Sequence, residues 1–288
     1  MRVLLNLIFF QVMSTTAILP GCTLVDKSNS KDNMAEKGFA FVNGINMYYE
    51  VVGQGEPLVL IHGGGSTIET TFGRIRDSLA QHYSVIAMDL QAHGRTQDRN
   101  QNLTFDQDAD DVYQLLRFLK IEKANVMGFS NGGNTAMRLA IQYPECVDKL
   151  IVASSFYRRD GLIDNFFEGM RHASLVNMPQ PLKEAFLKVN PDTSKLQVMH
   201  DKDRDRMLAF NDWRDEDLGL IKSPTLIIIG QMDIVKHSHA EKMANLIPEA
   251  EYKIVKGGHG SYIGEVCAEF DEEAISSTLN LILTFLES

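Results

Sequence analysis

The sequence predicts an α/β fold, in which a mainly parallel, twisted sheet of about eight strands has helices on both faces and carries an inserted helical cap. One observation predicts the sheet and its covering. Short apolar runs alternate with helical segments from residue 38 onwards, and consecutive parallel strands need crossover connections of this kind. A second observation predicts the cap: residues 156–222 interrupt the alternation with a charged stretch rich in methionine and aromatic residues, and such long insertions usually form lids.

Strand-like and helical segments follow one another through residues 38–288. The turn dipeptide Asn43-Gly44 joins the first two strands, so we expect an antiparallel hairpin at one edge of the sheet. The third run, residues 57–61, is apolar without interruption, as a strand buried on both faces requires. The expected strands are residues 39–42, 45–52, 57–61, 84–88, 124–129, 150–153, 225–229 and 251–255.

Helical spacing of apolar residues predicts the segments between these strands. Ala109, Val112 and Leu116 fall on one face, so residues 105–120 form an amphipathic helix. The expected helices of the sheet domain are residues 68–82, 105–120, 131–142, 239–246 and 268–286.

The composition is that of a globular protein. The 288 residues are 44% apolar and 23% charged, which excludes a disordered or fibrous chain. The formal net charge is −10 at pH 7, and because an acidic surface repels phosphate backbones, we expect no nucleic-acid partner. Three cysteines are too few for a disulfide framework, and none has the C-x-x-C spacing of a zinc site.

The first 21 residues have the pattern of an export signal. A positively charged start precedes an apolar run over residues 3–10 that only Asn6 interrupts, as in secretory signal peptides. The run is too short for a transmembrane helix. We therefore predict that residues 1–21 are a signal peptide and that the protein is exported.

The predicted signal ends in a motif typical of lipidation. Leu19-Pro20-Gly21-Cys22 resembles the bacterial lipobox, with Pro20 an unusual residue in that motif. A lipobox implies that Cys22 is lipidated, that residues 22–37 form a flexible tether, and that the protein meets a membrane of the cell envelope only through this anchor. Plain secretion, or a buried N-terminal strand with a free Cys22, are the alternatives. The folded domain then spans residues 38–288.

A G-x-S-x-G motif lies between a predicted strand and a predicted helix. It reads Gly128-Phe129-Ser130-Asn131-Gly132. A serine hydroxyl is a weak nucleophile unless it is held exposed beside a base, and a sharp strand-to-helix turn with small flanking residues holds it so. We therefore predict that Ser130 is a nucleophile. A glycine-rich turn in which Ser130 only caps the helix is the alternative.

Three glycines follow the strand at residues 57–61, in the run His62-Gly63-Gly64-Gly65. The tetrahedral intermediate of acyl transfer carries an oxyanion that preorganised N–H groups stabilise, and glycines let such a loop approach the substrate. We predict that the backbone N–H groups of Gly64 and Asn131 are these donors, and that His62 supports the loop by hydrogen bonding. A phosphate-binding loop is disfavoured because the G-x-x-x-x-G-K-[ST] spacing is absent.

An acid and a base follow two later strands. Asp233 comes after the strand at residues 225–229, and His259 after the strand at residues 251–255. The carboxyl ends of parallel strands are where functional groups of open sheets converge. We therefore predict that Asp233 and His259 lie close to Ser130.

Other candidates for these two roles are weaker. Asp160, just beyond the strand at residues 150–153, is the reserve for the acid. The other histidines lie at a helix start or lack flanking glycines and a preceding strand. These are His82, His172, His200, His237 and His239.

In this order, the motifs resemble those of α/β-hydrolases of the serine esterase and lipase type, over residues 39–286. That fold places its nucleophile, acid and base in the order Ser130, Asp233, His259. The resemblance implies a helical cap over the pocket, no cofactor and hydrolysis through an acyl-enzyme.

One further loop contributes to the resemblance. The run Asp89-Leu-Gln-Ala-His-Gly-Arg-Thr96 looks like the D-x-x-G-x-G-x-S loop common in that family. Ala92 stands where glycine is usual, and Thr96 stands where serine is usual.

We therefore expect a metal-free hydrolase that cleaves a carboxylic ester of a small hydrophobic molecule. The same catalytic residues serve C–C bond hydrolases, enol-lactonases, thioesterases and perhydrolases, so these activities remain open. Epoxide hydrolases and haloalkane dehalogenases need a carboxylate where Ser130 stands. A non-catalytic, ligand-binding member of the fold is a further alternative, which the presence of all three catalytic residue types disfavours.

The predicted cap would select the substrate. Its aromatic and methionine side chains either line an acyl pocket or, as we favour, form the core of the cap; they include Phe156, Tyr157, Phe166, Phe167, Met170 and Trp213. Its charged side chains are expected on solvated helix faces; they include Arg158, Arg159, Asp160, Asp201, Lys202, Asp203 and Arg204.

Overall fold

The computed structural model describes residues 36–288. The predicted signal peptide (1–21), the predicted lipidation site Cys22 and most of the predicted tether lie outside the described residues. Glu36 and Lys37, which we assigned to the tether, instead begin the first strand. Lys37 pairs with Glu50 across that strand pair, and its ammonium lies 3.2 Å from the Glu50 carboxylate.

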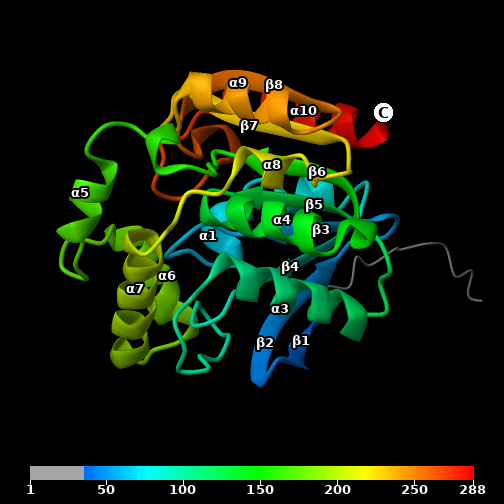
Figure 1. The fold of residues 1–288 in the computed structure, drawn as a ribbon. Helices are drawn as coiled ribbons and strands as arrows, with labels where there is room; N and C mark the ends of the chain where they lie inside the picture. The colour runs from blue at the N-terminus through cyan, green and yellow to red at the C-terminus, as the bar shows by residue number, and fades with distance from the viewer. Residues whose placement is uncertain (1–35) are drawn as a thin grey trace, which may run out of the picture. The chain divides into compact units, whose positions relative to one another are not determined.

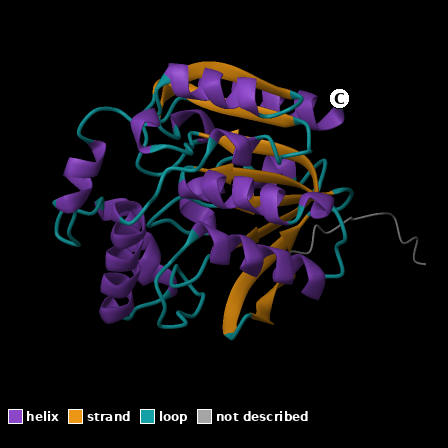
Figure 2. Ribbon diagram, in the orientation of Figure 1, coloured by secondary structure: helices purple, strands orange, loops and turns teal. Residues whose placement is uncertain are grey.

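An eight-stranded sheet forms the centre of the molecule (Figures 1 and 2). Its strands are β1 Glu36–Val42, β2 Ile45–Val52, β3 Pro57–Ile61, β4 Ser84–Met88, β5 Ala124–Phe129, β6 Val147–Ala153, β7 Thr225–Met232 and β8 Ala250–Gly258. The spatial order is β1-β2-β4-β3-β5-β6-β7-β8. β2 is antiparallel to β1 and to β4, and every other pairing is parallel. The prediction of a mainly parallel sheet with an antiparallel hairpin at its edge is therefore confirmed.

Helices cover both faces of this sheet, as predicted. Side chains alternate between the two faces along each strand: Val59 and Ile61 of β3 pack on one side, and Leu58 and Leu60 on the other. The first side is covered by α3 Phe105–Phe118, α4 Asn131–Gln142 and α9 His237–Leu246. The second is covered by α1 Ile68–Phe72, α2 Arg76–Leu79 and α10 Glu272–Glu287.

Four of the five predicted helices have different bounds in the structure. α3 ends at Phe118 instead of residue 120, and α9 begins at His237 instead of residue 239. The segment 68–82 is two short helices, because the hydrogen-bond pattern of the α-helix breaks between them: the N–H of Ile75 donates to the carbonyl of Phe72, only three residues before it, at 3.0 Å. The last helix begins at Glu272 instead of residue 268. Its start is set by Asp271, whose side chain accepts a hydrogen bond from the backbone N–H of Ala274 at 3.1 Å.

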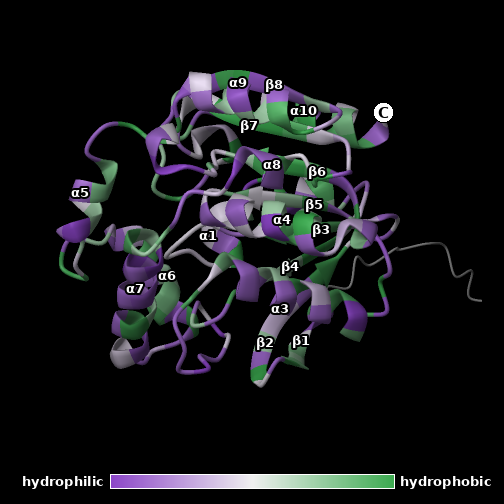
Figure 3. Cartoon of the chain, viewed as in Figure 1, coloured by the Kyte–Doolittle hydropathy of each residue, from purple (hydrophilic) through white to green (hydrophobic). Residues whose placement is uncertain are grey.

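The segment between β6 and β7 forms the helical cap. It contains α5 Phe166–Arg171, α6 Gln180–Val189, α7 Thr193–Leu208 and α8 Asp215–Leu218. α7 is largely hydrophilic (Figure 3), yet Leu196 and Met199 on one of its faces pack with Met178 and Phe186 in a small apolar cluster. Within the described residues, no helix is both long and apolar enough to cross a membrane.

His239 of α9 is a buried, neutral histidine. Its Nε2 accepts a hydrogen bond from the backbone N–H of Tyr157 at 3.2 Å, and its ring stacks on the Tyr157 ring at 4.8 Å. Burial lowers the pKa of His239 from 6.5 to about 4. The unfolded chain therefore binds a proton near pH 6.5 that the folded chain does not bind until about pH 4.

We expect this difference to make folding less stable as the pH falls from 6.5 to 4, by up to about 1.4 kcal/mol per pH unit. Urea unfolding at several pH values measures the slope. Replacing His239 with Gln keeps an acceptor but removes the titrating group, so the variant should lose less stability over this window than the wild type. Parallel pH profiles for the two proteins would contradict the prediction.

Candidate active site

Ser130 sits on a sharp turn between β5 and α4. Its backbone is in an unusual conformation, with φ 53° and ψ −123°, and its N–H donates to the carbonyl of Ala153 at 2.8 Å. Both glycines of the motif are sterically required. A Cβ at Gly128 would lie 2.1 Å from the carbonyl oxygen of Gly132, and a Cβ at Gly132 would lie 2.1 Å from the carbonyl oxygen of Ile61. Close backbone packing therefore holds the serine at the turn.

We expect Gly132→Ala to destabilise the fold by about 1–3 kcal/mol and to reduce any activity of Ser130, because the added methyl group meets backbone atoms that cannot rotate away. Helix propensity alone predicts the opposite sign. Gly169 in α5 is the matched control: a Cβ added there would have no atom within 4 Å, so Gly169→Ala should stabilise by about 0.5–1 kcal/mol. Chemical denaturation of both variants checks the pair, and equal stabilities would refute the steric argument.

The structure brings Ser130, His259 and Asp233 together, each directly after the last residue of a strand. The His259 Nε2 atom lies 3.2 Å from the Ser130 hydroxyl oxygen, and its Nδ1 atom lies 2.9 Å from an oxygen of Asp233. The imidazole also packs against the ring of Phe129, with the ring centroids 4.8 Å apart. This arrangement links hydroxyl, imidazole and carboxylate in one chain of hydrogen bonds.

Asp233 is held as a buried, ionised carboxylate. It accepts hydrogen bonds from the backbone N–H groups of Gly230 and Val235, at 3.0 and 3.2 Å. Burial alone would raise the pKa of Asp233, but the hydrogen bonds from His259, Ser154 and Gly230 outweigh it, and the pKa lies below its ordinary value. The carboxylate therefore stays charged beside the imidazole.

Ser154 and Tyr262 support this carboxylate, and our sequence analysis missed both. The Ser154 hydroxyl donates to Asp233, and the Tyr262 hydroxyl lies 2.6 Å from that of Ser154. Because a carboxylate only accepts, the single Ser154 proton points to Asp233, and Tyr262 donates to Ser154. The signal for Ser154 was its position, directly after β6 at the carboxyl edge of the sheet.

The reserve candidates lie elsewhere. The side chain of Asp160 is 70% exposed and pairs with Arg158 at 3.4 Å. The Nε2 atom of His237 hydrogen-bonds the carbonyl of Gln231 at 3.1 Å. Neither residue hydrogen-bonds Ser130 or His259.

Among residues 36–288, the loop after β3 finds no hydrogen-bond partner for one of its N–H groups, that of Gly64. The Gly63 N–H donates to Thr71 at 3.3 Å, and the Gly65 N–H donates to Asp203. Within the described residues, the N–H groups of Gly64 and Asn131 donate no hydrogen bond. These are the two groups that we predicted as oxyanion donors. A Cβ at Gly64 would lie 2.4 Å from the Asn131 side chain, so glycine is required there.

His62 supports this loop from beneath. Its Nε2 accepts the N–H of Leu90 at 2.9 Å, so its proton lies on Nδ1, which donates to the Gly63 carbonyl at 2.7 Å. The ring is fully buried, and burial lowers the pKa of His62 to about 3. The neutral histidine thus links the loop after β3 to the loop after β4 through these two hydrogen bonds.

Both residues that depart from the usual motif in the loop at residues 89–96 have defined positions in the structure. Ala92 has φ 64°, a conformation that favours glycine. The Thr96 hydroxyl donates to the Asp89 carbonyl and accepts the N–H of Tyr48 at 2.9 Å, a pair of bonds that a serine hydroxyl can also make. The Asp89 carboxylate accepts the N–H of Ile68 at 3.1 Å and so fixes the start of α1.

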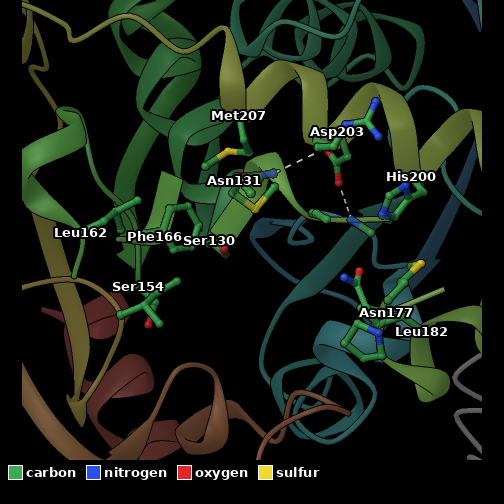
Figure 4. A pocket seen from close by; sticks show the side chains of 18 of the residues that line it. Ser130, Asn131, Ser154, Leu162, Phe166, Asn177, Leu182, His200, Asp203 and Met207 are labelled. Carbon is green, nitrogen blue, oxygen red and sulfur yellow. Dashed lines mark hydrogen bonds between the residues drawn. The ribbon is translucent and has the colours of Figure 1, made fainter. Parts of the chain in front are cut away.

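A cavity of about 290 Å³ opens over Ser130, between the sheet and the cap (Figure 4). Its apolar lining includes Phe156, Leu162, Phe166, Met170, Met178, Leu182, Met207 and Ile234. Its polar lining includes Ser130, Asn131, Ser154, Asn177, His200, Asp203 and Arg204. All six aromatic and methionine side chains named in the sequence analysis pack in or against the core, and Phe156, Phe166 and Met170 also line the cavity.

One prediction about the cap charges is wrong. Asp203, which we placed on a solvated helix face, is only 7% exposed. It lies on the same face of α7 as Arg206, three residues further on, and the two side chains form a buried ion pair.

Within residues 36–288, no three His, Cys, Asp or Glu side chains gather as a metal-ligand set.

Comparisons with known proteins agree with this architecture. A family model described as the alpha/beta hydrolase fold matches residues 56–181. An uncharacterised protein of Mycobacterium tuberculosis is 36% identical over 117 residues, which cover 41% of this chain and 34% of that protein. The chain thus spans about a third of the length of the mycobacterial relatives that it matches.

Two further proteins are similar over most of their length. The 2-hydroxy-6-oxo-6-(2'-aminophenyl)hexa-2,4-dienoic acid hydrolase of Metapseudomonas resinovorans is 25% identical, over 90% of this chain and 96% of that enzyme. The crystal structure of a serine hydrolase involved in carbazole degradation has a TM-score of 0.72 and 24% identity, and the match covers 88% of this chain and 99% of that one. Together with the strand order, these likenesses show that the chain has the α/β-hydrolase fold.

Proposed function

We propose that this protein is a serine hydrolase that cleaves a carboxylic ester of a small, uncharged, apolar substrate through an acyl-enzyme on Ser130. The observation that carries the proposal is the chain of hydrogen bonds, 3.2 Å from Ser130 to His259 and 2.9 Å from His259 to Asp233. A nucleophile, a base and an orienting acid in this geometry form the arrangement that acyl transfer needs.

The mechanism follows from that geometry. The Ser130 hydroxyl oxygen attacks the ester carbonyl while His259 Nε2 takes its proton, and Asp233 holds the Nδ1–H tautomer and stabilises the imidazolium. The oxyanion forms between the unpaired N–H groups of Gly64 and Asn131. The alcohol leaves with the proton from His259. Water then attacks the acyl-enzyme by the same route and releases the acid.

The cavity supports an uncharged acyl group. Of the described residues that line it, Arg204 and His200 are the only basic ones, and both are occupied by neighbouring acids. The Arg204 guanidinium pairs with Asp201 at 3.1 Å and with Asp205 at 2.8 Å, and His200 lies 3.1 Å from Asp201. With Asp203 also facing the cavity, a substrate carboxylate would find negative charge and no free cation.

C–C bond hydrolysis is the second candidate. The relative from Metapseudomonas resinovorans, similar over 90% of this chain, is named for a dienoic acid substrate. The charge pattern of the cavity favours the ester because no described cation is free to bind such a carboxylate.

Two measurements test the proposal. A labelled fluorophosphonate should modify Ser130, as identified by peptide mass spectrometry, whereas a non-catalytic binding protein would remain unlabelled. A substrate panel should then rank neutral p-nitrophenyl esters above lactones, thioesters and a vinylogous diketone that carries a carboxylate. Faster turnover of the carboxylate-bearing diketone than of every ester would establish the second candidate instead.

A further inference from the structure

A carboxylate from the cap reaches the loop that carries the proposed oxyanion donor. Asp203 of α7 accepts a hydrogen bond from the backbone N–H of Gly65, and its other oxygen lies 3.5 Å from the side-chain nitrogen of Asn131 (Figure 4). A Cβ added at Gly64 would lie only 2.7 Å from the Asp203 oxygen that accepts the Gly65 N–H. One side chain of the cap therefore touches both segments that flank the proposed oxyanion site.

Asp203 is in turn held by partners from the sheet domain and from its own helix. Its carboxylate lies 3.2 Å from Nε2 of His93 and forms an ion pair with Arg206. Arg206 also pairs with Asp108 of α3, and its guanidinium lies over the ring of Phe105 at 4.7 Å. Burial alone would raise the pKa of Asp203, but the charges of Arg206 and His93 hold it well below its usual range. The carboxylate is ionised and fixed in place.

The loop needs such an anchor because three consecutive glycines form the most flexible backbone that a chain can offer. At its other end, the Gly63 N–H is anchored by its hydrogen bond to Thr71. The Gly64 N–H lies between the two anchored groups. Oxyanion donors stabilise a transition state only when they are already in place, before charge develops.

We propose that Asp203 is a positioning residue that fixes the Gly64 N–H group for the oxyanion. The inference rests on the proposed ester hydrolysis, in which this N–H group is a donor. It also couples the cap to the chemistry, because α7 supplies both Asp203 and part of the cavity wall, including His200 and Met207. The loop is then preorganised only while the cap is docked on the sheet domain.

Asp203→Asn tests this role with little change in volume. The amide has one acceptor oxygen, so it cannot serve both the Gly65 N–H and Arg206. We expect kcat for a neutral p-nitrophenyl ester to fall by about 10- to 100-fold, with KM within about threefold, because a small misplacement of a donor acts mainly on the transition state. The affinity for an alkyl trifluoromethyl ketone, whose adduct with Ser130 places an oxyanion at the same N–H groups, should fall in parallel with kcat/KM.

Glu184→Gln is the matched control. It makes the same charge change within the cap, on α6, but the Glu184 side chain is exposed and hydrogen-bonds Gln180 at 2.9 Å. This variant should keep kcat and the ketone affinity within about twofold of the wild type. The inference is wrong if Asp203→Asn also keeps kcat and the ketone affinity within about twofold of the wild type. It is equally wrong if the two variants lose the same amount of kcat and ketone affinity. A wild type that neither hydrolyses esters nor reacts with fluorophosphonate would instead refute the proposed function.

A measurement on the unaltered protein covers the case in which Asp203→Asn does not fold. In protein labelled with ¹⁵N-glycine, the Gly65 amide proton should be shifted far downfield and protected from exchange, as a hydrogen bond to a buried carboxylate requires. A Gly65 amide that exchanges as fast as that of Gly44, which is exposed in the turn between β1 and β2, would overturn the inference, whatever the enzymatic activity.

Discussion

Replacing Ser130 with alanine is expected to lower kcat for ester hydrolysis by at least about 10⁴-fold, because the acyl-enzyme has no other oxygen on which to form. Fluorophosphonate labelling should disappear with the activity. The residual rate would reflect water attacking a carbonyl polarised by the N–H groups of Gly64 and Asn131. Steady-state hydrolysis of a short p-nitrophenyl ester by the purified variant measures the loss.

The fold should survive this substitution. The Ser130 hydroxyl hydrogen-bonds His259, at 3.2 Å, and alanine keeps the same backbone strain at φ 53°. We therefore expect the free energy of unfolding to stay within about 1 kcal/mol of the wild type. Ser276, exposed on α10, gives a serine-to-alanine control with unchanged kcat. A Ser130→Ala protein that hydrolyses esters at the wild-type rate would refute its assignment as nucleophile.

The sheet was predictable because its strands are short, apolar and separated by helical segments. The bounds of β3, β4 and β5 agree with the prediction to the residue, since each run is mostly apolar and a polar residue, His62, Asp89 or Ser130, follows it directly. β6, β7 and β8 are longer than predicted. Val147 of β6 pairs with Ala124, and Met232 of β7 pairs with Gly258 of β8, so pairing carries the strands past less apolar residues. Neighbour pairing is a tertiary effect that one-dimensional patterns do not contain.

The candidate site was predictable to the extent that its residues follow strands. Ser130, Asp233 and His259 each come directly after a strand, so topology alone brings them to one edge of the sheet. The contacts of Asp203 had no such signal. It stands in the run Asp-Lys-Asp-Arg-Asp-Arg, in which all six residues are charged, so the sequence does not mark one face of the helix as buried. Only the docking of α7 on the rest of the protein buries Asp203 and Arg206.

Asp233→Asn is expected to lower kcat by about 10⁴-fold at neutral pH while leaving substrate binding nearly unchanged. The carboxylate accepts hydrogen bonds from Ser154 and from the backbone N–H groups of Gly230 and Val235. Ser154 and Gly230 bond one carboxylate oxygen, whereas His259 Nδ1 and the Val235 N–H share the other. In the variant, the amide oxygen would remain with Ser154 and Gly230, and the amide nitrogen would take the place of the oxygen that faces His259 Nδ1. That nitrogen donates, so Nδ1 must accept and the imidazole proton moves to Nε2. An Nε2 that carries a proton cannot take the one from Ser130.

Asp160→Asn separates this effect from a general loss of negative charge near the cap. Asp160 also follows a strand and was the reserve candidate for the acid, but its side chain is exposed and pairs with Arg158. We expect that variant to keep kcat within about twofold of the wild type. Comparing kcat and KM of the two variants on one ester decides between the acids. A large loss in Asp160→Asn with little change in Asp233→Asn would mean that the hydrogen bond between His259 and Asp233, 2.9 Å long in this structure, does not orient the base.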